Sequence, residues 1–327
     1  MPPLAEDSEL LRELDGLVAA GRYDDVRARL RALPVAMVES RTRLALLAAE
    51  AEGRLGDHVA AARWTHVALA LAQNRGERHA ELRARNFEGA IALARGAVAD
   101  AERHFTGALE LARLLGDPAT EARCLNNLGI LANIRGDPDA ALARYRLALV
   151  AYQHAGFVRG LAETQHNIAI SVRDQRDYRR ALLAAEEAVR LAWSAGDARL
   201  AALAAVGRAE LHLLLGDVPL AAAELDRAAA TYDNLHFPAG LPEVRRLQAA
   251  VARTRGDANA AVRLLREAAD LATQYASTDV LADIERDLAA TLEASRDHAG
   301  ARAARERASA LYRRLGATRA ADDLLPL

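Results

Sequence analysis

A turn signal recurs every 40 residues along this chain, and this period constrains the fold more than any other feature. Gly-Asp or an equivalent pair begins at Gly56, Gly96, Gly136, Arg176, Gly216, Gly256 and Arg296. A second series of turn residues lies halfway between them, at Gly76, Gly116, Gly156, Gly196 and Gly316. Glycine favours the left-handed backbone that ends a helix, and the aspartate after it caps the next helix. The pattern therefore predicts consecutive helices of about 17 residues, each roughly 25 Å long, joined by short turns.

Small residues keep the same register as the turns. Alanine stands five residues after every turn of the first series, at Ala61, Ala101, Ala141, Ala181, Ala221, Ala261 and Ala301. It stands twelve residues after them at Ala68, Ala108, Ala148, Ala188, Ala228, Ala268 and Ala308. A third small column lies seven residues before each turn, at Ala49, Gly89, Gly129, Ala169, Ala209, Ala249 and Ala289. Small side chains on one helix face allow a neighbouring backbone to approach closely, so these columns predict tightly packed helical hairpins.

Composition supports the all-α class. Hydrophobic residues make up 52% of the 327-residue chain and charged residues 27%, which excludes disorder over most of its length. Aromatic residues make up only 4%, and 20 glycines and 9 prolines are too few for the turns of a β-sandwich or barrel. The remaining residues are dominated by Ala, Leu, Arg and Glu, which favour helices.

The pattern resembles the tetratricopeptide repeat, which has a small residue, a turn glycine seven residues later, and alanines five and twelve residues beyond the turn. The best single unit runs from Leu125 through Gly129 and Gly136 to Tyr145 and Ala148. The 40-residue period is similar to that of the repeats in kinesin light chains and in the sensor regions of maltose-regulator-type (MalT-like) bacterial activators. The resemblance implies a right-handed α-solenoid of antiparallel helical hairpins.

The register divides the chain into three parts. Residues 1–41 are expected to form a degenerate N-terminal capping hairpin, because Gly21 precedes Gly56 by only 35 residues and Val26 occupies an alanine position. Residues 42–321 are expected to form seven 40-residue repeats, and residues 322–327 a tail. The units depart from the family pattern where Phe105 and Tyr145 are replaced in later units by Ala185, Leu225, Leu265 and Arg305.

Charge and motifs exclude several functions. The net charge of −2 lacks the basic excess that nucleic-acid binding requires. Cys124 is the only cysteine, no uninterrupted apolar run is long enough to span a membrane, and the N-terminal stretch does not resemble a secretory signal. We find none of the common catalytic, phosphate-binding or metal-binding motifs, and the nine histidines are scattered. We therefore expect a cytoplasmic protein without catalytic activity, cofactor or metal.

Polar residues on the first helix of each repeat are candidates for binding. We expect five positions of each first helix to face the inner surface of the superhelix. They lie six, three and two residues before the third small column, and one and four residues after it. In the N-terminal half the candidate residues are Arg83, Asn86, Arg123, Asn126, Asn127, Asn133, His166, Asn167 and Arg173. Arginine suits carboxylates, and asparagine can both donate to and accept from a peptide backbone. In the repeats that this chain resembles, similar residues bind peptides that are often acidic.

Glu163, Glu243 and Asp283 occupy the arginine position in later repeats, where nearby arginines should make the surface mixed in sign. The sequence thus favours a protein- or peptide-binding scaffold or adaptor that prefers an acidic partner in its N-terminal half. Two alternatives are a ligand-sensing region of a bacterial transcriptional or signalling protein and a self-assembling scaffold. Trp64 and Trp193 lie on second helices and are expected to pack against the next hairpin.

Overall fold

Glycine-aspartate turns divide the chain into helices as the sequence predicts. The computed structural model describes residues 5–275 and 277–324, and within them every regular element is helical. The helices are α1 (Ala5–Ala19), α2 (Tyr23–Arg31), α3 (Val35–Glu39), α4 (Thr42–Arg54), α5 (His58–Arg75), α6 (Arg78–Ala94), α7 (Val98–Leu115), α8 (Pro118–Ile134), α9 (Pro138–His154), α10 (Val158–Asp174), α11 (Tyr178–Ser194), α12 (Ala198–Leu214), α13 (Val218–Asn234), the 3₁₀ turn η1 (Pro238–Gly240), α14 (Leu241–Thr254), α15 (Ala258–Gln274), α16 (Thr278–Ala294), α17 (His298–Arg314) and α18 (Thr318–Asp322). The all-α prediction is confirmed.

The turns work as their residue types imply. Gly136 has a positive φ of 76°, and the Asp137 side chain after it accepts a hydrogen bond from the backbone N–H of Ala140 at 3.0 Å. Arg176 and Arg296 occupy the same turn position with positive φ values of 64° and 63°. Because a left-handed backbone is unfavourable for residues with a side chain, these two positions carry a local conformational cost that glycine would avoid.

The three small columns form the contacts between paired helices. Ala148 and Ala268, one from each half of the chain, are fully buried. Gly89 and Gly129 lie so close to aromatic rings that an added Cβ would stand 2.5 Å from Phe105 and 2.4 Å from Tyr145. Where the column holds alanine instead, the facing position holds a smaller or non-aromatic residue. In later repeats the aromatic residue on the second helix is therefore lost together with the glycine on the first helix, because alanine on the first helix takes up part of the space of the ring.

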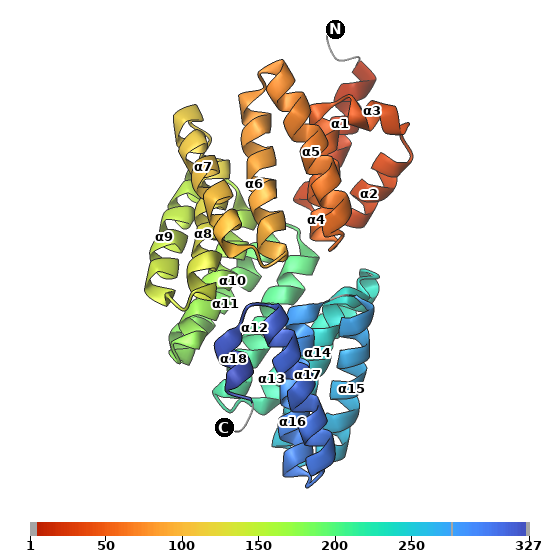
Figure 1. The fold of residues 1–327 in the computed structure, drawn as a ribbon, viewed down its shortest axis with the longest axis vertical. Helices are drawn as coiled ribbons and strands as arrows, with labels where there is room; N and C mark the ends of the chain where they lie inside the picture. The colour runs from red at the N-terminus through yellow and green to blue at the C-terminus, as the bar shows by residue number, and fades with distance from the viewer. Residues whose placement is uncertain (1–4, 276, 325–327) are drawn as a thin grey trace. The chain divides into compact units, whose positions relative to one another are not determined.

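The chain forms two compact units. Unit 1 comprises Met1–Arg176 and Glu187–Leu200, and unit 2 comprises Asp177–Glu186 and Ala201–Leu327. In unit 1, α4 to α10 pack in chain order, each against the next, and the first helices α4, α6, α8 and α10 also contact one another along the row (Figure 1). In unit 2, α13 to α18 pack in chain order. The row of first helices is the surface on which the candidate binding residues lie.

Candidate functional site

Polar and charged side chains from six helices or helix starts meet on the row of first helices in unit 1. We call this group the inner network. It consists of Tyr23, Glu50, Arg54, Arg83, Arg123, Arg159, Glu163 and Asp197. Arg83, Arg123 and Glu163 lie one repeat apart, so each successive first helix contributes a charged side chain to the row. The network contains one more guanidinium group than carboxylate groups.

Glu163 of α10 lies at the centre of the inner network. Its Oε1 atom lies 2.9 Å from Arg54 Nη1 and 3.3 Å from Arg159 Nη2. Burial raises the pKa of the Glu163 carboxyl, but Arg54, Arg159 and Arg123 outweigh it, so the pKa lies below its usual value. Glu163 is therefore ionised at neutral pH and binds the two arginines together. The Arg54 side chain nevertheless remains 41% exposed, so solvent reaches this surface.

Tyr23 and Asp197 complete the network from distant parts of the chain. Arg159 Nε donates to Asp197 Oδ2 at 2.7 Å, and Arg159 Nη1 donates to the hydroxyl of Tyr23, which is 136 residues away in sequence. Gly21 precedes Tyr23 at a positive φ of 69°, and a Cβ there would lie 2.7 Å from the Asp197 carboxylate. Glycine is thus required at Gly21 both by the turn and by the close approach of the carboxylate.

The predicted asparagines form a ladder between neighbouring repeats. Asn127 Nδ2 donates to Asn86 Oδ1 at 3.3 Å, and Asn167 Nδ2 donates to Asn126 Oδ1 at 3.1 Å. Asn86 and Asn126 are buried, with 2% and 6% exposure, whereas Asn127 and Asn167 are partly exposed. Within the described residues the carbonyl oxygens of Asn127 and Asn167 accept no hydrogen bond, so each can accept one from a ligand.

The structure corrects one expectation about the predicted arginines. Their positions on the inner surface predict that Arg83 and Arg123 face solvent in the free protein. Instead, Arg83 is 22% exposed and pairs with Glu50 at 3.3 Å. Arg123 is partly buried, with its guanidinium carbon 6.0 Å from the centre of the Phe157 ring. Burial disfavours the charged form of Arg123, but Glu50 and Glu163 help to raise its pKa above the usual value, so it stays charged.

The remaining candidates lie outside the inner network. Asn133 donates to Ser171 Oγ at 2.5 Å and lies 3.4 Å from the Tyr145 hydroxyl. Arg173 pairs with Asp174, its neighbour in sequence, at 2.9 Å, and His166 is partly buried on α10. The structure thus brings Arg83 and Arg123 together with residues that the sequence did not single out. Glu50 follows the small column directly and could have been found by the inward-facing rule. Asp197 follows Gly196 as a helix-capping aspartate, which gave no sign of its pairing with Arg159, and Tyr23 follows no repeat pattern.

Unit 2 has a matching position with the opposite balance of charge. Arg246 of α14 is 7% exposed and pairs with Glu243 at 2.6 Å, Asp287 at 2.8 Å and Glu210 at 3.3 Å. Burial lowers the pKa of Arg246, but hydrogen bonding to Glu243 and the three carboxylate charges outweigh it and raise the pKa. Arg286 also pairs with Asp287 at 3.1 Å and with Asp283 at 2.7 Å, so two guanidiniums lie among four carboxylates.

The described residues form neither a metal centre nor a membrane span, and their cysteine is buried. Within residues 5–275 and 277–324, no group of three or more His, Cys, Asp or Glu side chains is arranged to hold a metal ion. No helix in the described part of the chain is both long and apolar enough to cross a membrane. Burial raises the pKa of the Cys124 thiol to about 12, so this cysteine is an unreactive residue of the core.

Comparison with known proteins identifies the repeat in one segment of the chain and supports the fold. Residues 83–154 match the family model described as tetratricopeptide repeat. A Rap protein complexed with competence and sporulation factor is similar in fold, with 16% identity and a TM-score of 0.64, and the match covers 97% of this chain and 95% of the other. NprR in complex with its cognate peptide NprX has 16% identity and a TM-score of 0.58, with coverage of 91% and 87%.

A third similar structure is a signal-transduction ATPase of the STAND class from Pyrococcus horikoshii, which has a tetratricopeptide repeat sensor. It is 12% identical with a TM-score of 0.61, and the match covers 93% of this chain but 49% of the ATPase chain. No curated protein sequence matches this chain. Residues 83–154 thus match the tetratricopeptide repeat, and the fold is that of a tetratricopeptide-repeat solenoid, as the sequence predicts.

Proposed function

We propose that this protein is a peptide-binding regulator or adaptor that uses the inner network and the asparagine ladder of unit 1 to hold a peptide bearing a carboxylate. The observation that carries the proposal is the exposed side of the inner network. Arg54 and Arg83 keep 41% and 22% of their side-chain surface accessible, although each forms an ion pair. A guanidinium has five N–H donors, so one carboxylate partner does not exhaust it.

The asparagine ladder supplies the second half of the proposed site. The free carbonyl oxygens of Asn127 and Asn167 are one repeat apart and can accept hydrogen bonds from a peptide backbone whatever its side chains are. The arginines would then select a carboxylate along the same peptide. The two similar structures described as complexes, with competence and sporulation factor and with NprX, support this class of ligand.

The pairing of Arg83 with Glu50 determines how the proposal must be tested. Replacing Arg83 with glutamate would place two carboxylates together, so a loss of binding could reflect misfolding. The informative variant combines Arg83→Gln with Arg123→Gln. Its matched control combines Arg103→Gln with Arg113→Gln on α7, because both of those side chains are more than half exposed and lie outside the inner network.

Peptides selected from a random display library on the immobilised protein provide the ligands, and fluorescence anisotropy measures their affinities. We expect the selected peptides to be enriched in Asp, Glu or a free C-terminal carboxylate, and their binding to weaken as salt increases. The double variant of Arg83 and Arg123 should lose about tenfold or more in affinity, whereas the α7 control should not. Equal binding by both variants, or selection of neutral peptides alone, would contradict the proposal.

A regulatory sensor is the second candidate function, and the similarity to the STAND protein favours it. That structure includes a tetratricopeptide repeat sensor, and about half of its chain matches this one. In this alternative the same surface would bind a small ligand and pass the signal to another domain or protein. Loss of peptide selection together with binding of a small metabolite at the inner network would support the sensor.

A further inference from the structure

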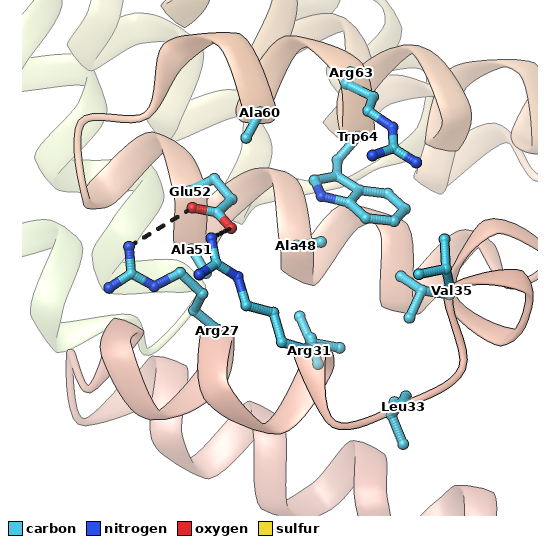
Figure 2. Close-up of a pocket in the computed structure, with 12 residues that line it drawn as sticks. Arg27, Arg31, Leu33, Val35, Ala48, Ala51, Glu52, Ala60, Arg63 and Trp64 are labelled. Atoms are coloured by element: carbon cyan, nitrogen blue, oxygen red, sulfur yellow. Dashed lines mark hydrogen bonds and ion pairs between the residues drawn. The ribbon is translucent and has the colours of Figure 1, made fainter.

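A small pocket lies between α2, α3, α4 and α5, away from the inner network. Its volume is about 270 Å³, slightly below the roughly 300–1,000 Å³ typical of small-molecule sites. The apolar part of the lining consists of Leu30, Leu33, Val35, Val38, Ala48, Ala51, Ala60 and Trp64. Figure 2 shows the Trp64 indole facing this space from α5 while Arg27 and Arg31 reach towards Glu52 from α2. The pocket can therefore hold a ligand with a few apolar carbon atoms and a polar end.

Glu52 gives the pocket an unsatisfied acceptor. Its side chain is only 7% exposed, and Oε1 accepts a hydrogen bond from Arg31 Nη2 at 3.2 Å. Oε2 is buried, accepts no hydrogen bond from any described residue, and lies 3.9 Å from Arg27 Nη1. Buried carboxylate oxygens without a donor are rare because they lose hydration without compensation. The Oε2 atom is thus positioned to accept a hydrogen bond from a ligand that enters the pocket.

The arginines supply donors next to this acceptor. Arg31 lines the pocket, is 66% exposed and uses one N–H on Glu52, so its other N–H groups can donate to a ligand. Arg27 binds Asp24 at 2.7 Å, and Arg63 binds Glu39 at 2.6 Å. A ligand that only donates would leave the Arg31 donors unused, and a ligand that only accepts would leave Glu52 Oε2 unsatisfied.

We infer that this pocket binds a free apolar α-amino acid in its zwitterionic form. The ammonium group donates to Glu52 Oε2, the carboxylate accepts from Arg31, and the apolar side chain packs against Trp64. The ammonium and carboxylate of an α-amino acid are adjacent, as are Glu52 and Arg31. Glu52 lies two residues from Glu50 of the inner network, and residues at this spacing do not share a helix face. The site is therefore distinct from the proposed peptide site.

Binding of leucine and phenylalanine tests the inference directly. In a Trp193→Phe background Trp64 is the sole tryptophan, because the chain has two. Its fluorescence and titration calorimetry should report saturable binding of the free amino acids. Leucinamide lacks the carboxylate and N-acetyl-leucine lacks the ammonium group, so each should bind at least about tenfold more weakly. No binding of leucine or phenylalanine, or equal binding of either leucine derivative, would overturn the inference.

Variants locate the site. Glu52→Gln and Arg31→Gln should each weaken leucine binding by about tenfold or more, whereas Arg29→Gln should not. Arg29 belongs to the same helix but pairs with Glu13 outside the pocket. If Glu52→Gln lowers the helical circular dichroism, Ala48→Leu tests the pocket instead, by filling it and abolishing binding. Leucine binding that survives both Arg31→Gln and Ala48→Leu unchanged would overturn the inference.

Discussion

Each unit has its own row of first helices, and the two rows carry opposite charge balances. In unit 1 the single carboxylate of Glu163 lies between Arg54 and Arg159. In unit 2 Arg246 pairs with three carboxylates, of which Asp287 also pairs with Arg286. A repeat fold fixes where an inward side chain lies and leaves its charge free to vary. The two faces therefore share a scaffold and present different chemistry to a partner.

Removing the centre of the unit 2 cluster should have the largest effect. Arg246→Met removes the buried cation that pairs with Glu210, Glu243 and Asp287, and breaking such an arrangement costs about 3–5 kcal/mol, although Asp287 keeps its pair with Arg286. Urea denaturation followed by circular dichroism at neutral pH measures the loss. Arg245→Met, which removes a partly exposed pair with Glu267, is the control and should cost much less. Equal losses would show that the cluster adds little to stability.

The matching change in unit 1 should cost about 2–3 kcal/mol and depend on pH. Glu163→Gln removes the anion between Arg54 and Arg159. The pKa of Glu163 is lowered from its ordinary 4.5, so its contribution is fully present above that value and is lost as pH falls through the lower folded-state pKa. The difference in unfolding free energy between variant and wild type should thus be largest near neutral pH and shrink in acid below about 4.5. A difference independent of pH would contradict the ion-pair assignment.

A substitution in the alanine column tests helix packing without changing any charged side chain. Ala148→Leu adds bulk at a fully buried position of α9 and should cost about 1–3 kcal/mol. Val150→Leu on the same helix is the control, since Val150 is 52% exposed and its replacement should change little. Thermal melting monitored by circular dichroism distinguishes the two. An unchanged melting temperature for Ala148→Leu would mean that the alanine column does not form the helix contact.

The smallest expected effect lies at two turns. Arg176→Gly and Arg296→Gly each replace a side chain held at positive φ, so each should stabilise the protein by at most about 1 kcal/mol. The gain is limited because glycine also increases the entropy of the unfolded chain. Gly136→Ala is the reverse control and should destabilise. If both arginine variants are destabilising, contacts of those side chains outweigh the backbone cost.

The repeat period predicted most of the fold because each turn and small residue acts within its own hairpin. Candidate residues such as Arg83 and Asn126 were found by the same register, since it also fixes which positions point inward. The pairing of Tyr23 with Arg159 could not be predicted, because it depends on small rotations accumulated over several repeats. The pocket beside Glu52 lies among the N-terminal helices, where the register is degenerate. Trp64 packs against a core cluster that includes Ala84 of the next hairpin, as expected, and it also lines that pocket, whereas Trp193 is 57% exposed.

The glycine-aromatic pairs limit how such an array can be rearranged by recombination. Gly89 and Phe105 belong to different helices of one hairpin, and the ring occupies the space where any other residue would carry its Cβ. A crossover at the turn inside the hairpin would separate the two partners. A first helix with glycine would then meet a second helix with a small side chain, which leaves a void. A first helix with alanine would meet a second helix with an aromatic ring, which causes a clash. Exchange between hairpins keeps both members together. The heritable module of this protein is therefore the hairpin that begins at α6 or α8. Chimaeras joined between hairpins should fold, whereas chimaeras joined at the turn within a hairpin should not.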